Sequence, residues 1–212
     1  KFNFEYAMKT LQFNVPTTQG QSLTIQEDVM DSFYPHLHRH QEAQLMWIKK
    51  GKGVLVVEDT LHPFKENDIF VLGANQPHVF KSMSQDGLLN ESRSISIFFD
   101  PNGKLKSLFS LGEFDSLNHF IQSNARGFKV PHTYFQQISE RVVQLKEADE
   151  LDKLMQFFYL LRSLAMISKE TEPLCAERIE FNHENSSGVS RITLICNYIK
   201  ENFEEKQIMP DV

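Results

Sequence analysis

"YPHLHRHQEAQLMWIKKGKGVLVVEDTLHPFKENDIFVLGANQPHVF", residues 34–80, decides the fold, because short apolar runs alternate in it with turn residues. The runs "EAQLMWI", "GVLVVE", "DIFVLG" and "HVF" are rich in the β-branched and aromatic residues that strands favour. Between them lie "KKGKG", "FKEND" and "LGANQP", whose Gly, Asn and Pro residues change the direction of the chain. Many short, closely spaced strands predict an antiparallel barrel or sandwich.

Strands continue on both sides of this stretch, in "TLQFNV", "LTIQEDV" and "RSISIFF". After Asp100 the apolar residues recur at helical spacing, which predicts helices within residues 113–125, 130–147 and 150–168. A chain of 212 residues with 41% apolar residues can bury a substantial core. The sequence therefore predicts a mainly β fold with α-helices, in which a barrel of residues 1 to about 100 is followed by helices in residues 101–170.

The predicted helix 150–168 carries two apolar stripes, which the helical period places roughly 120° apart. One stripe contains Leu151, Leu154, Phe158, Leu161 and Ala165, and the other contains Phe157, Leu160, Leu164 and Ile167. A single neighbour cannot cover both. Either the helix is buried inside its own domain, or the barrel covers one stripe and a second subunit covers the other. The second interpretation predicts a homodimer through Leu151, Leu154, Phe158 and Leu161.

The composition changes again after residue 170. Residues 171–187 lose periodicity and gain Glu, Asn and Ser, which is typical of an interdomain linker. Residues 188–212 contain the amphipathic run "VSRITLICNYIKENFEE" and then Pro210, which is placed for the first turn of another helix. This pattern predicts the start of a second domain, cut short at residue 212; the alternative is a tail that packs back on the first domain.

Charge and cysteine content exclude several classes of protein. A net charge of −6 argues against a broad basic face for nucleic acid or for an anionic membrane. Cys175 and Cys196 form no metal-binding or redox spacing, and a reducing cytoplasm fits them better than an oxidising compartment. No apolar run approaches the ~20 residues of a membrane span. We therefore expect a cytoplasmic protein without a membrane partner.

Two separated stretches resemble the same family. Residues 34–80, with the turn "GKG", the turn "ND" and the closing "PH", are similar to the cupin-type sensor domain of AraC-family transcriptional regulators. Residues 191–212, "RITLICNYIKENFEEKQIMPDV", look like the opening helix of that family's helix-turn-helix DNA-binding domain. The resemblance implies a cupin-like antiparallel β-barrel (double-stranded β-helix), an effector-sensing and dimerisation domain over residues 1–170, and a truncated all-α DNA-binding domain over 188–212. Asn67 replaces the usual glycine of its turn, which Asn tolerates because it enters the left-handed region.

A row of polar side chains marks the candidate site. Residues 38, 40, 42 and 44 share one face of an extended segment, and serines alternate with aliphatic residues in "RSISIFF". If those aliphatic residues face the helices, the serines point into the barrel. The predicted ligand-binding residues are His38, His40, Glu42, Gln44, His78, Ser94, Ser96 and Phe98.

The chemistry of this row leaves three interpretations open. Metal-binding members of the cupin superfamily have a glutamate at the position of Gln44, and an uncharged amide is a poorer ligand for a divalent cation, so neither a metal nor another cofactor is assigned. The second interpretation is a pocket for an organic ligand, for which the many donors and acceptors favour a sugar or polyol. The third is that the histidines are purely structural.

Together these features predict a ligand-responsive transcriptional regulator rather than an enzyme. Its barrel binds a small effector, its helices dimerise, and DNA is bound through the full-length protein only. No nucleophile lies beside a base, and no glycine loop cradles a phosphate. The alternatives are a cupin enzyme with a metal at the histidine row and a dimerisation module that binds no ligand.

Overall fold

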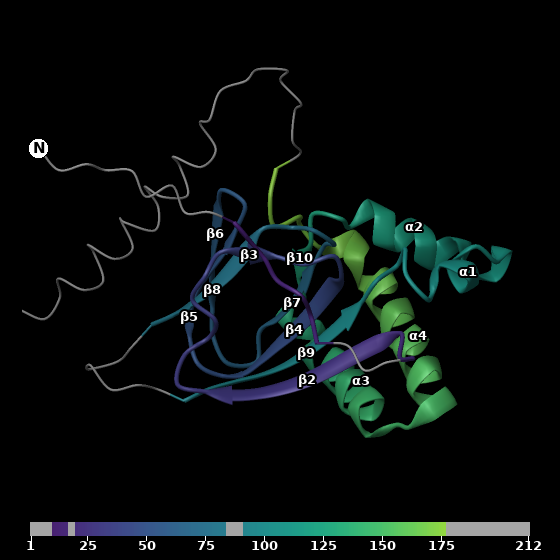
Figure 1. The fold of residues 1–212 in the computed structure, drawn as a ribbon, viewed down its shortest axis with the longest axis horizontal. Helices are drawn as coiled ribbons and strands as arrows, with labels where there is room; N and C mark the ends of the chain where they lie inside the picture. The colour runs from purple at the N-terminus through teal and green to yellow at the C-terminus, as the bar shows by residue number, and fades with distance from the viewer. Residues whose placement is uncertain (1–9, 17–19, 84–90, 177–212) are drawn as a thin grey trace, which may run out of the picture.

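The computed structural model describes residues 10–16, 20–83 and 91–176. Two five-stranded sheets face each other and form a barrel, and the helices lie together on one side of it (Figure 1). Most of the predicted linker, Cys196 and the predicted start of a DNA-binding domain at 188–212 lie outside the described residues, so the second domain stays a prediction.

The first sheet carries two of the three histidines that the sequence singled out. Its order is β1 (Leu11–Gln12), β3 (His38–Arg39), β8 (His78–Ser82), β5 (Gly53–Val57) and β6 (Thr60–Phe64). His38 on β3 pairs directly with His78 on β8. The β1–β3 pair is parallel, and the other pairs are antiparallel.

The second sheet separates the barrel interior from the helices. Its order is β10 (Phe128–Lys129), β7 (Ile69–Leu72), β4 (Ala43–Lys50), β9 (Ser92–Phe99) and β2 (Leu23–Met30), all antiparallel. Successive side chains of a strand point to opposite faces, so each of these strands serves two environments. Ile95, Ile97 and Phe99 of β9 pack in one buried cluster with helical residues, so the condition under which the serines point into the barrel is met.

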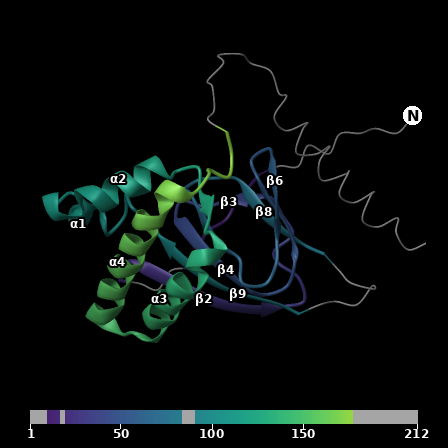
Figure 2. The ribbon, with the colours of Figure 1, turned by 180° about the vertical axis from the view of Figure 1, so that it is seen from behind.

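The helices cover the outer face of the second sheet, at the right of Figure 1 and at the left of the reverse view in Figure 2. They are α1 (Lys106–Phe109), α2 (Asp115–Ser123), α3 (Phe135–Glu147) and α4 (Glu150–Ile167), with short 3-10 turns at Gly112–Phe114, His132–Tyr134 and Ser168–Glu170. The three helices predicted from periodicity correspond to α2, α3 and α4. Within the described residues, no helix is long and apolar enough to cross a membrane.

Two short strands, β6 and β10, were not predicted, and the extended segment predicted for residues 38–48 is interrupted at residues 40–42, which separate β3 from β4. β6 contains Pro63, which cannot donate a hydrogen bond to a neighbouring strand, and β6 lies at the edge of its sheet, where a proline is tolerated. β3 and β10 are two residues long and exist through their pairing with β8 and β7. Asn67 has the left-handed backbone expected of it, with φ of 70°.

The two stripes of α4 are both used inside the chain. Phe157, Leu160, Leu164 and Ile167 are buried against the second sheet and the other helices. From the stripe predicted to dimerise, Leu161 is buried, Leu154 packs on the same cluster, and Phe158 meets the ring of Phe114 with centroids 4.7 Å apart. Leu151 is the one exposed member of the four dimerisation residues. The structure therefore agrees with the interpretation in which this helix is buried in its own domain.

Candidate functional site

Three histidines meet inside the barrel, at the end where β3, β4 and β8 come together. His38 is half-buried, and His40 and His78 are each 1% exposed. One ring nitrogen from each residue lies within 4.8 Å of the others. The ring centroids of His38 and His78 are 4.4 Å apart, and those of His40 and His78 are 5.1 Å apart. The predicted row thus becomes a compact cluster because β8 supplies the third ring.

Backbone carbonyls fix the tautomer of each ring. Nδ1 of His38 lies 2.9 Å from the carbonyl oxygen of His36, Nδ1 of His40 lies 2.8 Å from that of Glu42, and Nδ1 of His78 lies 2.8 Å from that of Gln76. A carbonyl oxygen only accepts, so each Nδ1 carries the hydrogen and donates. In a neutral imidazole the other nitrogen, Nε2, then presents a lone pair. In His40 this acceptor faces Gln44, and one nitrogen of each of the three rings belongs to the cluster described above.

Burial keeps the rings neutral. Desolvation lowers the pKa of His38 and of His40. The hydrogen bond between the side chains of His40 and Gln44 raises the pKa of His40 and offsets this lowering only in part. Desolvation, together with the nearby His38 and His40, lowers the pKa of His78 well below its ordinary value. Neutral imidazole with a free Nε2 is the form that binds a metal ion or accepts a hydrogen bond from a ligand.

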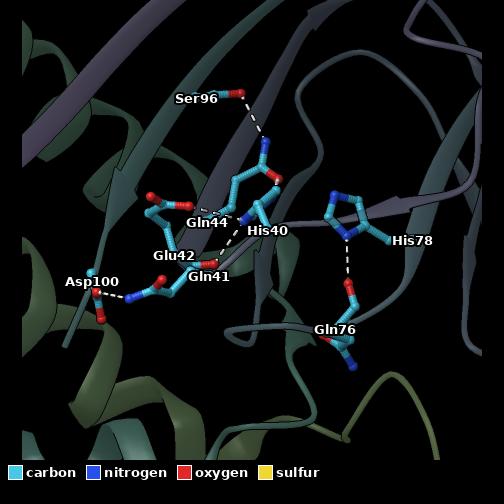
Figure 3. Close-up of polar contacts among 8 residues, drawn as sticks. All are labelled: His40, Gln41, Glu42, Gln44, Gln76, His78, Ser96 and Asp100. Carbon is cyan, nitrogen blue, oxygen red and sulfur yellow. Dashed lines mark hydrogen bonds and ion pairs between the residues drawn. The ribbon is translucent and has the colours of Figure 1, made fainter. Parts of the chain in front are cut away.

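Gln44 and Ser96 extend the cluster along the second sheet (Figure 3). Gln44 Oε1 lies 3.2 Å from His40 Nε2, and Gln44 Nε2 donates to Ser96 Oγ over 3.1 Å. Because His40 Nε2 is an acceptor in the neutral ring, this arrangement sets one acceptor against another. The repulsion between these two acceptors is removed when a cation lies between them. It is also removed when the Gln44 amide turns over, because its nitrogen then donates to His40 and its oxygen accepts from Ser96 Oγ.

The remaining predicted residues lie around this centre. Phe98 packs edge-on against His40 with ring centroids 5.3 Å apart. The Glu42 carboxylate is 3.9 Å from His40 Nδ1, which places it on the far side of that ring from Nε2. Ser94 is buried farther along β9, opposite Ile48. The structure thus gathers His38, His40, Gln44, His78, Ser96 and Phe98, and it leaves Glu42 and Ser94 at the periphery.

Gln76 is a residue of this site that sequence reasoning missed. Its backbone oxygen holds His78, and its side chain accepts from the backbone N–H of Gly73 and donates to the carbonyl of Arg126. It is 4% exposed, so these bonds form in a dry environment. The sequence carries one signal for it, a polar residue directly before the "PH" pair, and that signal is weak.

The donor set fits a divalent transition metal. Three imidazole nitrogens and one amide oxygen make four ligands, and each ring is oriented by a carbonyl on its other nitrogen, as is usual for metal-binding histidines. Ligand nitrogens at about 2.0–2.1 Å from a tetrahedral ion lie about 3.4 Å apart. The cluster, at 4.8 Å or less, needs to contract by less than about 1.5 Å to reach that geometry.

Comparison with known proteins supports the family. Residues 19–90 match the model of the AraC-like ligand binding domain. No curated protein matches the chain. Similar solved structures include ToxT from Vibrio cholerae, with 14% identity, 90% of this chain and 78% of that chain covered, and a TM-score of 0.46. The AraC-like transcriptional activator CuxR is 9% identical, with 80% of this chain and 54% of that chain covered and a TM-score of 0.39. Oxalate decarboxylase is 16% identical, with 48% of this chain and 29% of that chain covered and a TM-score of 0.32.

All three TM-scores are below 0.5, so the family rests on the matched model and on the two stretches of sequence that resemble it. The matched region contains His38, His40, Gln44 and His78, the centre of the cluster. Residues 19–90 are similar to the AraC-like ligand binding domain, in agreement with the resemblance of residues 34–80 to the AraC family.

Proposed function

We propose that this chain is the sensing part of a ligand-responsive transcriptional regulator and that its ligand binds at the cluster of His38, His40, Gln44, His78 and Ser96. The observation that carries the proposal is the convergence of three imidazole nitrogens within 4.8 Å, inside the region that matches a ligand-binding domain. Neutral imidazoles gathered in this way can accept from the donors of a ligand or bind positive charge. A regulator fits this better than an enzyme, because the cluster offers binding groups without a nucleophile.

The ligand class that we propose is a small polyhydroxylated molecule, a sugar or a polyol. Neighbouring hydroxyls can each donate to one Nε2 and accept from the turned amide of Gln44. Phe98 would contact the apolar face of such a ring. Because His40 and His78 are covered in the unliganded chain, the barrel has to open slightly to admit the molecule.

A thermal-shift screen of sugars, polyols and aromatic acids tests this function. A ligand at 100 times its Kd stabilises the folded chain by about 2.7 kcal/mol, which raises Tm by roughly 5–10 °C for a chain of this size. The double variant His40→Ala with Ser96→Leu removes one acceptor and fills space, so it should lose the response. The matched control is His119→Ala with Ser123→Leu, an exposed pair on α2 that should keep it.

A response that survives in the His40 and Ser96 variant would place the ligand elsewhere and contradict the proposed site. If no compound of the three classes changes Tm in the native chain, while a metal ion does, the organic ligand is wrong and the second candidate below stands. If neither does, the chain is a module that binds no ligand.

The second candidate is a divalent metal ion as the signal. It is favoured by the position of Gln44 Oε1, which faces His40 Nε2 at 3.2 Å, because two acceptors at that distance are what a bound cation requires. Titration with Ni²⁺ or Zn²⁺ by calorimetry should then give one ion for each chain. His78→Ala should abolish binding, and His119→Ala on α2 should not.

Dimerisation is proposed through the exposed side of α4. Four large apolar side chains of this helix are exposed, and their spacing places them along one side of it. They are Leu151 (69% exposed), Met155 (43%), Tyr159 (43%) and Met166 (68%). A homodimer would cover them. Sedimentation should show a dimer that Met155→Glu converts to monomer without loss of folding, whereas Phe158→Glu should disrupt the fold because Phe158 packs inside the chain. A dimer that is unchanged by Met155→Glu would place the interface elsewhere.

A further inference from the structure

Residues 173–175, near the end of the described residues, connect the edges of the two sheets. Pro173 forms a bridge with Phe128 of β10, and the N–H of Leu174 donates to the carbonyl of Gly127 over 3.1 Å. On the other side, the Leu174 carbonyl accepts from Thr60 Oγ1 at 2.6 Å and from His62 Nε2 at 2.7 Å, both on β6. We call residues 173–175 the clasp.

The clasp is also part of the barrel core. The Leu174 side chain is 3% exposed and packs in the cluster between the two sheets, with residues such as Phe64, Phe70 and Leu72. Gly127 allows the close approach, because a Cβ at this position would lie 2.4 Å from the carbonyl oxygen of Val71 and 3.1 Å from Leu174 Cδ1. Detaching the clasp therefore exposes apolar surface and breaks three backbone contacts.

Gln76 connects the clasp to the histidine site. Its backbone oxygen accepts from His78 Nδ1 at 2.8 Å (Figure 3), and its side-chain nitrogen donates to Cys175 Sγ at 3.4 Å and to the Arg126 carbonyl at 2.9 Å. Arg126 precedes Gly127, which holds Leu174. Gln76 thus contacts His78 through its main chain. Through its side chain it contacts Cys175 of the clasp and Arg126, the residue before Gly127.

We propose that the clasp is coupled to the histidine site through Gln76, so that occupancy of the site tightens the attachment of residues 173–175 to the barrel. The inference rests on the proposed function, because it uses the same ligand site. It adds a route by which a bound ligand changes how firmly residues 173–175 are held against the barrel.

The direction of the effect follows from the chemistry of His78. A ligand on Nε2, whether a metal ion or a hydroxyl donor, withdraws electron density from the ring and makes Nδ1–H a stronger donor to Gln76. The ring also loses rotational freedom. Gln76 is then held in the position in which its amide reaches Cys175 and Arg126, and opening of the clasp becomes less frequent.

Alkylation of Cys175 measures that opening. The thiol is buried, so N-ethylmaleimide reacts when the clasp opens. All chains carry Cys196→Ser, which leaves Cys175 as the single thiol of the full 212-residue chain. Co²⁺ serves as the probe, because its visible absorption band reports binding independently of the thiol, and Trp47 fluorescence verifies folding.

We expect Co²⁺ to slow the alkylation of Cys175 at least about threefold, the scale of one hydrogen bond gained. Gln76→Met should keep the Co²⁺ band, react about tenfold faster than the parent chain, and lose the effect of Co²⁺ on the rate. Gln122→Met, an exposed glutamine on α2, is the matched control and should behave as the parent. A Co²⁺ band with an unchanged or faster rate in the parent chain would overturn the coupling while leaving the ligand site intact.

If Co²⁺ gives no band, the metal candidate fails, and the coupling is decided by a double-mutant cycle without any probe. His78→Leu should speed alkylation in the parent chain, because Gln76 loses its donor, and should add nothing in the Gln76→Met chain. Leucine fills most of the space of the imidazole, so the fold is preserved. Effects of the two substitutions that simply multiply would overturn the coupling.

Discussion

The two faces of the second sheet differ although they share the same strands. On the face toward the helices, β4 presents Ala43, Leu45 and Trp47, which pack with apolar residues of the helices. On the face toward the barrel interior, β4 presents Gln44, then Met46 and Ile48, so this face is polar at one end and apolar at the other. The outer face packs against the helices, and the polar end of the inner face carries the proposed ligand site.

Residues that we expect to stabilise the fold therefore alternate along β4 and β9 with residues that we expect to lie near a ligand. Moving by one position along β4 or β9 exchanges a side chain in the helix-facing core for one near the histidines. Substitutions on the two faces should therefore affect different measurements, which the following experiments can refute or refine.

The largest effect is expected on the helix-facing side. Phe157 is fully buried, and its ring lies 4.9 Å from that of Phe99. Phe157→Ala should lower the free energy of unfolding by about 3–5 kcal/mol, because it leaves a cavity that the helices cannot close. Urea unfolding followed by Trp47 fluorescence measures it. Val143→Ala, an exposed control on α3 outside the proposed dimer interface, should change the free energy by less than about 0.5 kcal/mol. Equal losses would show that the cluster is not the stabilising core.

The inner face should make stability depend on pH. The folded chain keeps His78 neutral because its pKa is lowered well below 6.5, while the unfolded chain takes up a proton as the pH falls through that value. The free energy of unfolding should therefore fall between pH 7.5 and pH 5, by at most about 1.4 kcal/mol per pH unit for this residue. His78→Leu should flatten the dependence. An unchanged slope in that variant would mean that other groups cause it.

Two surface ion pairs act mainly below this pH interval. The ion pair with Lys146 lowers the pKa of Glu27, and the ion pair with Arg93 lowers the pKa of Glu91, both from 4.5. Their contribution is present above that value and is lost as the pH falls below it. These two pairs therefore add little to the change expected between pH 7.5 and pH 5.

A negative charge introduced on the inner face should raise the affinity for a metal ion. Gln44→Glu replaces an amide oxygen with a carboxylate beside three imidazoles, and the affinity for Ni²⁺ should rise on the order of 10- to 100-fold. Isothermal titration calorimetry measures it, with the exposed Gln41→Glu as the control. Equal gains in both variants would indicate general charge attraction and not ligation by residue 44.

The smallest effect is expected from a single hydrogen bond of the inner face. Ser96→Ala removes the partner of Gln44 and should lower the free energy of unfolding by about 0.5–1.5 kcal/mol. Ser107→Ala, on an exposed helical position, should have almost none. If Ser96→Ala is neutral, the bond between Ser96 and Gln44 contributes nothing to the fold, and the serine is free to serve a ligand.

Much of the fold could be predicted because it depends on local pattern. Alternation in "RSISIFF" correctly placed Ile95, Ile97 and Phe99 toward the helices, and the left-handed turn at Asn67 followed from the residue type. The stripes of α4 were visible too. Periodicity shows that a face is covered and does not show by what, so the sequence could not distinguish the Phe109 and Phe114 rings from a partner subunit.

The site was less predictable because it depends on contacts between distant residues. The row from His38 to Gln44 is a local pattern, and its meeting with His78 came from the family resemblance. The contact of Gln76 with Cys175 joins residues 99 positions apart, and the only local signal is the weak one of a polar residue before the "PH" pair. β10 likewise forms only where the folded sheet provides an edge for Phe128.

The fixed tautomers of the three histidines have a consequence for the heat of binding. Rings that are already neutral near pH 7.5, with Nδ1–H donated to a carbonyl and Nε2 unprotonated, release no proton when a ligand takes Nε2. The enthalpy measured in phosphate and in Tris buffer should then agree, since no protons pass to the buffer. Such a sensor would respond to the concentration of its ligand with little interference from small changes in pH.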